Sequence, residues 1–169
     1  VESANPEILR NIDKPLDLEK VRKVVKWCKK LMIKTHATFC IGLPGETPDT
    51  IQKSIKFMEE LNADTAQVSK VIPYPGTPMY QWAMEHNHLS TTDLSQFDGA
   101  GKAILSSPEL SCDELDRWHG IFSRKVARKK ILQYLKEPVQ CISILREMWR
   151  RKGFLSVARS FVTFVERAF

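Results

Sequence analysis

The sequence predicts an α/β fold in which helices alternate with parallel strands, followed by a helical C-terminal region. Two observations lead to this prediction. Two short runs, 35–41 and 65–72, are apolar, partly β-branched and too brief for helices, and helical periodicity precedes each of them. Beyond residue 110 the apolar residues recur only at helical spacing. Helix, strand, helix and strand at these spacings are typical of parallel βαβ units.

The first long helix is predicted to begin after Asp17, in the segment LEKVRKVVKWCKKL. Its apolar side chains share one face, and lysines with Arg22 occupy the other. This pattern indicates a surface helix packed on a core. The run 35–41 follows and is predicted to be a buried strand.

A loop rich in glycine and proline, GLPGET, leaves that strand. It lacks the Lys-Ser/Thr ending of a nucleotide-triphosphate loop and the three-glycine spacing of a dinucleotide site, so we expect a tight turn rather than a phosphate cradle. Thr47 and Pro48 are expected to cap and start a helix over 48–61. Glu46 is expected to cap the same helix, beside its N-terminus.

The second strand, 65–72, is predicted to lead through the loop YPGTPMYQW into a helix from about Pro78 to Glu85. The next stretch, 86–110, shows weak periodicity and is expected to be irregular. Both features place the end of the α/β region near residue 85.

The C-terminal region is predicted to be helical. Ser111 with Glu114 makes a capping box, and the helix that it opens is expected to run to about Lys136. Two further helices are expected after Pro138 and Gly153. Arg159, Glu166 and Arg167 interrupt the last apolar stripe, which argues against a membrane-spanning segment.

Charge is distributed unevenly along the chain. Residues 1–98 hold 12 Lys and Arg against 13 Asp and Glu, a net charge of −1, whereas residues 99–169 hold 14 against 7, a net charge of +7. We therefore expect units of different character: 1–85, 86–110 and 111–169. Three interpretations of the basic end stay open: a solvated helical face, which we favour, a peripheral membrane contact through residues 153–169, and nucleic-acid binding.

The four cysteines, Cys28, Cys40, Cys112 and Cys141, are scattered and form no CxxC or CxxxC pair. We therefore expect no metal site and no disulfide within this chain, and a reducing, cytoplasmic setting. Cys40 is interpreted as a buried small hydrophobe rather than a reactive thiol. The sequence begins with Val1 rather than methionine, and we expect it to be a fragment.

Three segments in order, VES with IDK, then FCIGLPGET, then QVSKVIPYPGTPMY, resemble radical S-adenosylmethionine enzymes. The resemblance is greatest to the cobalamin-associated group, which includes the magnesium-protoporphyrin ester cyclase and hopanoid-biosynthesis enzymes. It covers roughly residues 1–85. It implies the second half of a partial (β/α)6 barrel, followed by a more variable α-helical C-terminal region.

The resemblance also implies a cofactor site at the carboxyl ends of the strands. Glu2 and Ser3 would contact the sugar and amino-acid portion of S-adenosylmethionine. Lys14 would lie near the methionine carboxylate, which fits simple charge pairing. Thr38 would face the ribose.

Adenine would lie between the two predicted strands. Cys40 and Ile41 would offer backbone atoms and an apolar wall, and Ile72 and Pro73 would close the pocket. Two more side chains are expected near the pocket mouth, where either one could touch the substrate: Lys70 and Tyr74.

By this resemblance the cofactors are S-adenosylmethionine and a [4Fe–4S] cluster, whose CxxxCxxC ligands are expected upstream because the motif is absent here. A cobalamin domain is expected upstream as well. The intact enzyme would abstract hydrogen from an unactivated carbon of a small, lipid-like or tetrapyrrole-like substrate, with no nucleic-acid partner. The fragment alone, without the N-terminal half of the barrel, would be inactive.

Two other functions stay open at this stage. One is a non-catalytic α/β binding or scaffold module, in which the same loops are only turns. The other keeps radical chemistry but uses it for methylthiolation of RNA. That function would call for an RNA-binding domain after the barrel, which the helical tail does not resemble.

Overall fold

The computed structural model describes residues 1–99, 101–136, 146 and 150. The chain divides into two compact units, Val1–Phe122 and Ser123–Phe169, and the division falls inside the helix α5 (Cys112–Lys136). The first unit therefore includes the opening turns of α5. The two helices predicted near the end of the chain lie outside the described residues.

The sheet of the first unit consists of parallel strands. Strand β1 (His36–Ile41) pairs with β2 (Thr65–Lys70) along its whole length. On the other edge of β1, Glu2 forms an isolated parallel bridge to Phe39. The predicted α/β class with parallel pairing is confirmed, whereas the (β/α)6 barrel stays a prediction.

Four helices occupy the positions that the sequence predicts. They are α2 (Leu18–Lys30), α3 (Pro48–Leu61), α4 (Pro78–Glu85) and α5. The short helix α1 (Pro6–Asn11) and a 3-10 turn at Leu94–Gln96 were not predicted. With only six residues, α1 is too short for periodicity to reveal, although its Asn5 cap and Pro6 start are typical helix signals. Strand β2 ends two residues earlier than predicted.

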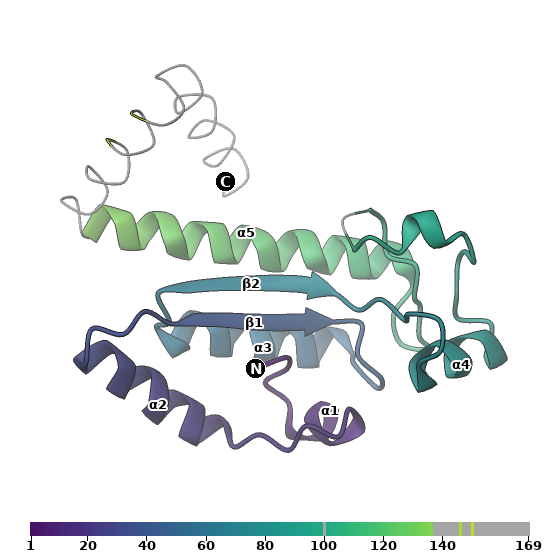
Figure 1. Cartoon of the computed structure of the whole chain (residues 1–169), viewed down its shortest axis with the longest axis horizontal. Coiled ribbons are helices and arrows are strands. Elements are labelled where there is room, and N and C mark those ends of the chain that lie inside the picture. Colours follow the sequence, from purple (N-terminus) through teal and green to yellow (C-terminus); the bar gives the residue numbers. More distant parts are fainter. Residues whose placement is uncertain (100, 137–145, 147–149, 151–169) are drawn as a thin grey trace. The chain divides into compact units, whose positions relative to one another are not determined.

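The two faces of the sheet differ in exposure. In β1, Ala37, Phe39 and Ile41 are buried, and His36 and Thr38 are exposed. Figure 1 shows α3 behind the strands, and its apolar side is buried. The covered face is closed further by Phe122 of α5, whose ring centroid lies 5.4 Å from that of Phe39. The opposite face, which we call the open face, is polar.

Helix α3 begins with a reciprocal cap. The Thr50 N–H donates to the Thr47 hydroxyl at 3.4 Å, and the Thr47 N–H donates to the Thr50 hydroxyl at 2.9 Å. Pro48 occupies the first turn, where a missing N–H costs nothing. The helix ends at Asn62, which adopts a left-handed conformation with φ 55°. Among the described residues, no helix is both long and apolar enough to cross a membrane.

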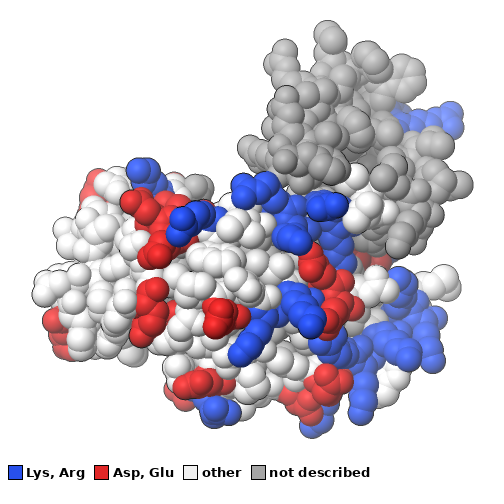
Figure 2. Space-filling model, turned by 180° about the vertical axis from the view of Figure 1, so that it is seen from behind, with Lys and Arg blue, Asp and Glu red and all other residues white. Residues whose placement is uncertain are grey.

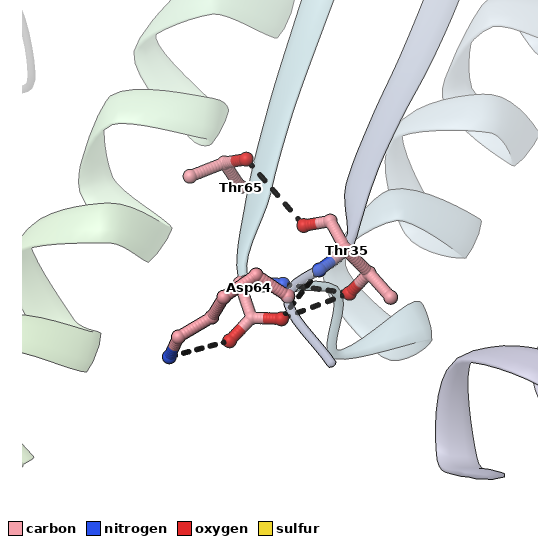
Figure 3. A network of polar contacts seen from close by, with 4 residues as sticks. Thr35, Asp64 and Thr65 are labelled. Carbon is pink, nitrogen blue, oxygen red and sulfur yellow. Dashed lines mark hydrogen bonds and ion pairs between the residues drawn. The ribbon is translucent and has the colours of Figure 1, made fainter. Parts of the chain in front are cut away.

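A polar network joins the beginnings of the two strands (Figure 3). Asp64 accepts hydrogen bonds from the Thr35 N–H at 2.8 Å and from the Thr35 hydroxyl at 3.0 Å. The Lys34 ammonium lies 3.2 Å from the other carboxylate oxygen. Partial burial raises the pKa of Asp64, but these hydrogen bonds outweigh burial and hold the pKa below its usual range.

Replacing Asp64 with asparagine should lower the free energy of unfolding by about 1–3 kcal/mol at pH 7, because hydrogen bonds to a charged acceptor are lost. The pKa of Asp64 is depressed in the folded state, so this stabilisation is present above the unfolded pKa and is lost as the pH falls through the folded pKa. Urea titrations of both proteins should therefore converge below about pH 4. Glu85→Gln, at an exposed carboxylate, is the control. A difference independent of pH would contradict this account.

Candidate functional site

The candidate site lies at the carboxyl ends of the parallel strands, where ligands bind in open α/β sheets. The Glu2 N–H donates to the Thr38 carbonyl at 3.1 Å, and the Cys40 N–H donates to the Glu2 carbonyl at 2.9 Å. This pairing brings three of the predicted cofactor residues together. Glu2 adopts a positive φ of 66°, which L-residues rarely occupy.

An ion pair stands at this edge of the sheet. The Lys14 ammonium lies 2.7 Å from a Glu2 carboxylate oxygen, and the two side chains are 49% and 31% exposed. Both predicted residues are therefore within reach of a ligand from solvent. A carboxylate beside an ammonium matches a ligand that itself carries both groups.

The open face of the two strands is a polar surface. In the sheet register Thr38 lies opposite Gln67, and Cys40 lies opposite Ser69. The Gln67 amide donates to the Ser69 hydroxyl at 3.2 Å. Gln67 and Ser69 are not among the residues predicted from the sequence to line the site. The alternation in TAQVSK was the signal that could have found them, because it places both on one face with Thr38.

Cys40 is a thiol rather than a thiolate. Burial, together with the nearby charges of Glu2 and Glu46, raises its pKa to about 12. A neutral thiol is a poor nucleophile and a poor metal ligand.

Two predicted residues point elsewhere. The Ser3 side chain is fully buried, and its hydroxyl lies 3.4 Å from that of Ser54 on α3 and accepts from the Asn5 N–H at 3.2 Å. Ile41 is fully buried on the covered face. Strand alternation explains this placement, because Ile41 follows the open-face residue Cys40. The structure therefore offers neither side chain to a ligand on the open face.

The residues after β2 are held by the loop that precedes α5. Pro73 is fully buried and Ile72 partly buried. The backbone of Gly99 lies against Ile72, since a Cβ at this glycine would be 3.3 Å from the Ile72 Cδ1. Tyr74 is 55% exposed, as expected for a residue at a pocket mouth.

Lys70 is not available to a substrate. Its side chain is only 8% exposed, and its ammonium lies 2.6 Å from an Asp116 carboxylate oxygen. It also donates to the Gly101 carbonyl. This pairing spans 46 residues of sequence, so no local pattern could have predicted it. The prediction that Lys70 touches the substrate is therefore corrected: Lys70 ties the end of β2 to α5.

Glu46 is the most unusual residue near the site. It is fully buried, and one oxygen accepts the Gly42 N–H at 2.6 Å and the Leu43 N–H at 3.3 Å. The other oxygen has no hydrogen-bond partner within the described part of the chain. Burial raises the pKa of Glu46 to about 7, against these hydrogen bonds. The predicted role as a cap of α3 is wrong, because Thr47 caps that helix and Glu46 instead closes its own loop.

The same loop is fixed from its outer side. The Asn11 amide of α1 donates to the Pro44 carbonyl at 2.9 Å. Gly45 adopts φ 79°, and a Cβ there would lie 2.9 Å from the Asn11 amide nitrogen. Only glycine fits this approach without a shift. The GLPGET segment is thus a tight turn, as the sequence predicts.

The described residues do not fit a [4Fe–4S] cluster. Among them, no group of three or more His, Cys, Asp or Glu side chains is placed to hold a metal. The described cysteines, Cys28, Cys40 and Cys112, are free. A cluster needs a compact set of thiolates, which these three do not provide.

Comparisons with known proteins relate this chain to radical S-adenosylmethionine enzymes. The profile of the Radical SAM superfamily matches residues 1–58. The chain is 35% identical over 155 residues to an uncharacterized methyltransferase from Pyrococcus horikoshii, covering 92% of this chain and 31% of that protein. The resemblance to the radical SAM superfamily is thereby confirmed for residues 1–58. The cobalamin-associated group stays a prediction.

Over shorter stretches the chain is also similar to methylthiotransferases. A probable threonylcarbamoyladenosine tRNA methylthiotransferase from Pyrococcus horikoshii is 29% identical over 84 residues, 48% of this chain and 20% of that protein. A ribosomal protein uS12 methylthiotransferase from a Roseiflexus species is 34% identical over 80 residues, 46% of this chain and 17% of that protein. The chain therefore spans a third or less of each of these relatives.

These relatives overturn one prediction about partners. The sequence was interpreted to indicate a small or lipid-like substrate and no nucleic acid, but the relatives are named for a tRNA and a ribosomal protein. The substrate prediction relied on the resemblance to hopanoid- and porphyrin-processing enzymes, whereas these relatives are named for macromolecules. The membrane contact expected through residues 153–169 belongs to the same overturned prediction, and those residues lie outside the described part.

Replacing Glu46 with glutamine should change how stability depends on pH. The folded pKa of about 7 lies above the unfolded value, so this group's contribution is fully present below the unfolded pKa and is lost as the pH rises through about 7. Glutamine keeps the shape and an acceptor oxygen but does not titrate. The wild-type protein should therefore lose stability relative to Glu46→Gln between about pH 4.5 and pH 7. Urea titrations at several pH values test this, and parallel profiles would contradict it.

Proposed function

We propose that the intact protein is a radical S-adenosylmethionine methyltransferase and that this chain forms one wall of its cofactor site. The observation that carries the proposal is the Glu2–Lys14 ion pair on the edge of β1, beside the carboxyl-terminal half of that strand. This pair lies within the residues that match the Radical SAM superfamily. S-Adenosylmethionine carries an ammonium and a carboxylate on one end, which are complementary to this pair.

Each residue of the wall has a role in this proposal. Lys14 would pair with the methionine carboxylate and Glu2 with its ammonium, so that one internal ion pair is exchanged for two. Thr38 would face the ribose, and the backbone of Cys40 would lie beside the adenine. Ser3 and Ile41 would act indirectly, by fixing the sheet edge on its covered face.

Two more positions complete the adenine pocket: Ile72 and Pro73. Pro73 is fully buried and Ile72 partly buried, which supports a rigid wall rather than a mobile one. Tyr74 remains the proposed contact to the substrate. When bound, the cofactor supplies the radical chemistry, and the chain supplies position and exclusion of water.

Methyl transfer is favoured over methylthiolation by the extent of similarity. The methyltransferase relative matches 155 residues of this chain, whereas the methylthiotransferases match 84 and 80. The region beyond the strands is therefore shared with the methyltransferase. We include cobalamin in the proposal on the basis of the three sequence segments alone, and the visible absorption of a corrinoid in the purified intact protein tests it.

A non-catalytic binding module is the alternative. It predicts that no longer form of the protein binds S-adenosylmethionine. Titration calorimetry of the intact, anaerobically reconstituted protein decides between the two functions. Micromolar to millimolar affinity supports the proposal, and no binding refutes it.

Replacing Lys14 with alanine should weaken S-adenosylmethionine binding about tenfold, which corresponds to about 1.4 kcal/mol, because the partner of the carboxylate is lost. Iron and sulfide content should be unchanged, since the substitution removes no cysteine. Titration calorimetry of the intact protein measures the affinity. Lys53→Ala, at an exposed lysine of α3, is the matched control. Equal affinity for the wild-type and Lys14→Ala proteins would remove Lys14 from the site.

A further inference from the structure

Helix α2 and the turn after it carry a concentrated positive charge. Between Lys20 and Lys34 the sequence contains seven Lys and Arg residues and no Asp or Glu. The net charge of residues 1–98 is only −1, because acidic residues elsewhere in that range offset this segment. The net charge of residues 1–98 therefore gives no sign of this strongly basic segment, which belongs to the same part of the chain as the candidate site.

One side of α2 is anchored to the neighbouring helix. The Arg22 guanidinium lies 2.8 Å from the Glu60 carboxylate of α3 and 4.4 Å from the centroid of the Phe57 ring. A cation over an aromatic face is favourable, and here it is combined with an ion pair. Arg22 is thus a structural cation that holds α2 in place.

The other lysines of α2 face solvent. Within the described part of the chain, four exposed lysines have no ion-pair partner: Lys23, Lys26, Lys29 and Lys30. Figure 2, which shows the molecule from behind, has Lys and Arg gathered over the side where α2 lies. Unpaired ammonium groups at this density repel one another, and an extended polyanion relieves that repulsion.

An aromatic side chain stands among these charges. Trp27 is 59% exposed, with Val24 at 50% and Leu31 at 68% beside it. Lys23 precedes Trp27 by four residues and Lys30 follows it by three, so both flank the indole on the helix surface. An exposed aromatic ring among cations is the arrangement by which proteins stack unpaired bases and bind the adjoining phosphates.

We propose that α2 is an RNA-binding surface. Its lysines contact phosphates, and Trp27 stacks on an unpaired base of a single-stranded loop. The helix begins four residues after Lys14, so RNA that lies along α2 reaches the edge of the candidate site. This inference goes beyond the proposed function and needs neither the cofactor nor the chemistry.

The surface suits RNA better than a membrane. Along the helix the exposed apolar residues form a single line, Val24 and Trp27, which continues into the turn after the helix as Leu31, Met32 and Ile33. Helices that lie in a membrane interface carry a much wider apolar face. On α2 the line is bordered by lysines instead, which favours a ligand that offers phosphates and flat apolar bases together.

Fluorescence anisotropy of a labelled RNA hairpin with a single-stranded loop tests the surface, using the intact protein without cofactor. Reversing two charges, with Lys23→Glu and Lys30→Glu, should weaken binding about tenfold or more and flatten the salt dependence. The matched control reverses Lys53 and Lys56, two exposed lysines of α3, and changes the net charge equally. The control should bind RNA within about twofold of the wild-type protein.

The indole is tested separately. Trp27→Ala should weaken binding to the hairpin about fivefold or more, and Trp27→Phe should retain most of the affinity because a ring remains. Binding to a fully paired duplex should be unaffected by either change. Circular dichroism of each variant confirms that α2 is still folded.

Several results would overturn the proposal. Equal weakening by the α2 and α3 charge reversals would show that only net charge matters. Binding to vesicles of phosphatidylglycerol, with no binding to RNA, would assign α2 to a membrane. S-Adenosylmethionine affinity is measured on the same variants, so loss of RNA binding with this affinity intact refutes neither the cofactor site nor its chemistry.

Discussion

The backbone pairing of Glu2 with β1 is the constraint on which the rest of the site depends. Two hydrogen bonds, to the Thr38 carbonyl and from the Cys40 N–H, fix this residue on the sheet edge. Its positive φ interrupts the regular alternation of side chains. The Glu2 carboxylate pairs with Lys14 at this edge, while the Ser3 side chain is buried against Ser54 of α3. One residue thereby joins the polar edge to the core.

The loop after β1 is held in shape by the buried carboxyl group of Glu46. Glu46 gathers the Gly42 and Leu43 N–H groups onto one oxygen, so these donors are already used and cannot cradle a phosphate. The other oxygen is buried without a partner in the described part of the chain, and burial raises the pKa to about 7. Glu46 therefore fixes the conformation of its own loop. The charged groups that we propose to bind the cofactor are those of Glu2 and Lys14.

Much of this fold could be predicted from the sequence, because local signals agree with the packing. Capping residues at Asp17 and Thr47 and the apolar periodicity of α3 placed the helices to within a residue. The candidate site was harder to predict. Glu46 and Lys70 received the wrong roles because their partners are set by tertiary contacts, a backbone turn in one case and Asp116 in the other. Periodicity carries no information about such contacts.

The account places cofactor binding and RNA binding on adjoining elements of one unit, with the strand edge holding the cofactor and α2 holding the RNA. The measurement that tests its central claim most directly is an anaerobic crystal structure of the intact protein with S-adenosylmethionine. The account predicts that the amino-acid end of the ligand lies against Glu2 and Lys14, which part to receive it. A ligand bound elsewhere, with the Glu2–Lys14 ion pair intact, would contradict it.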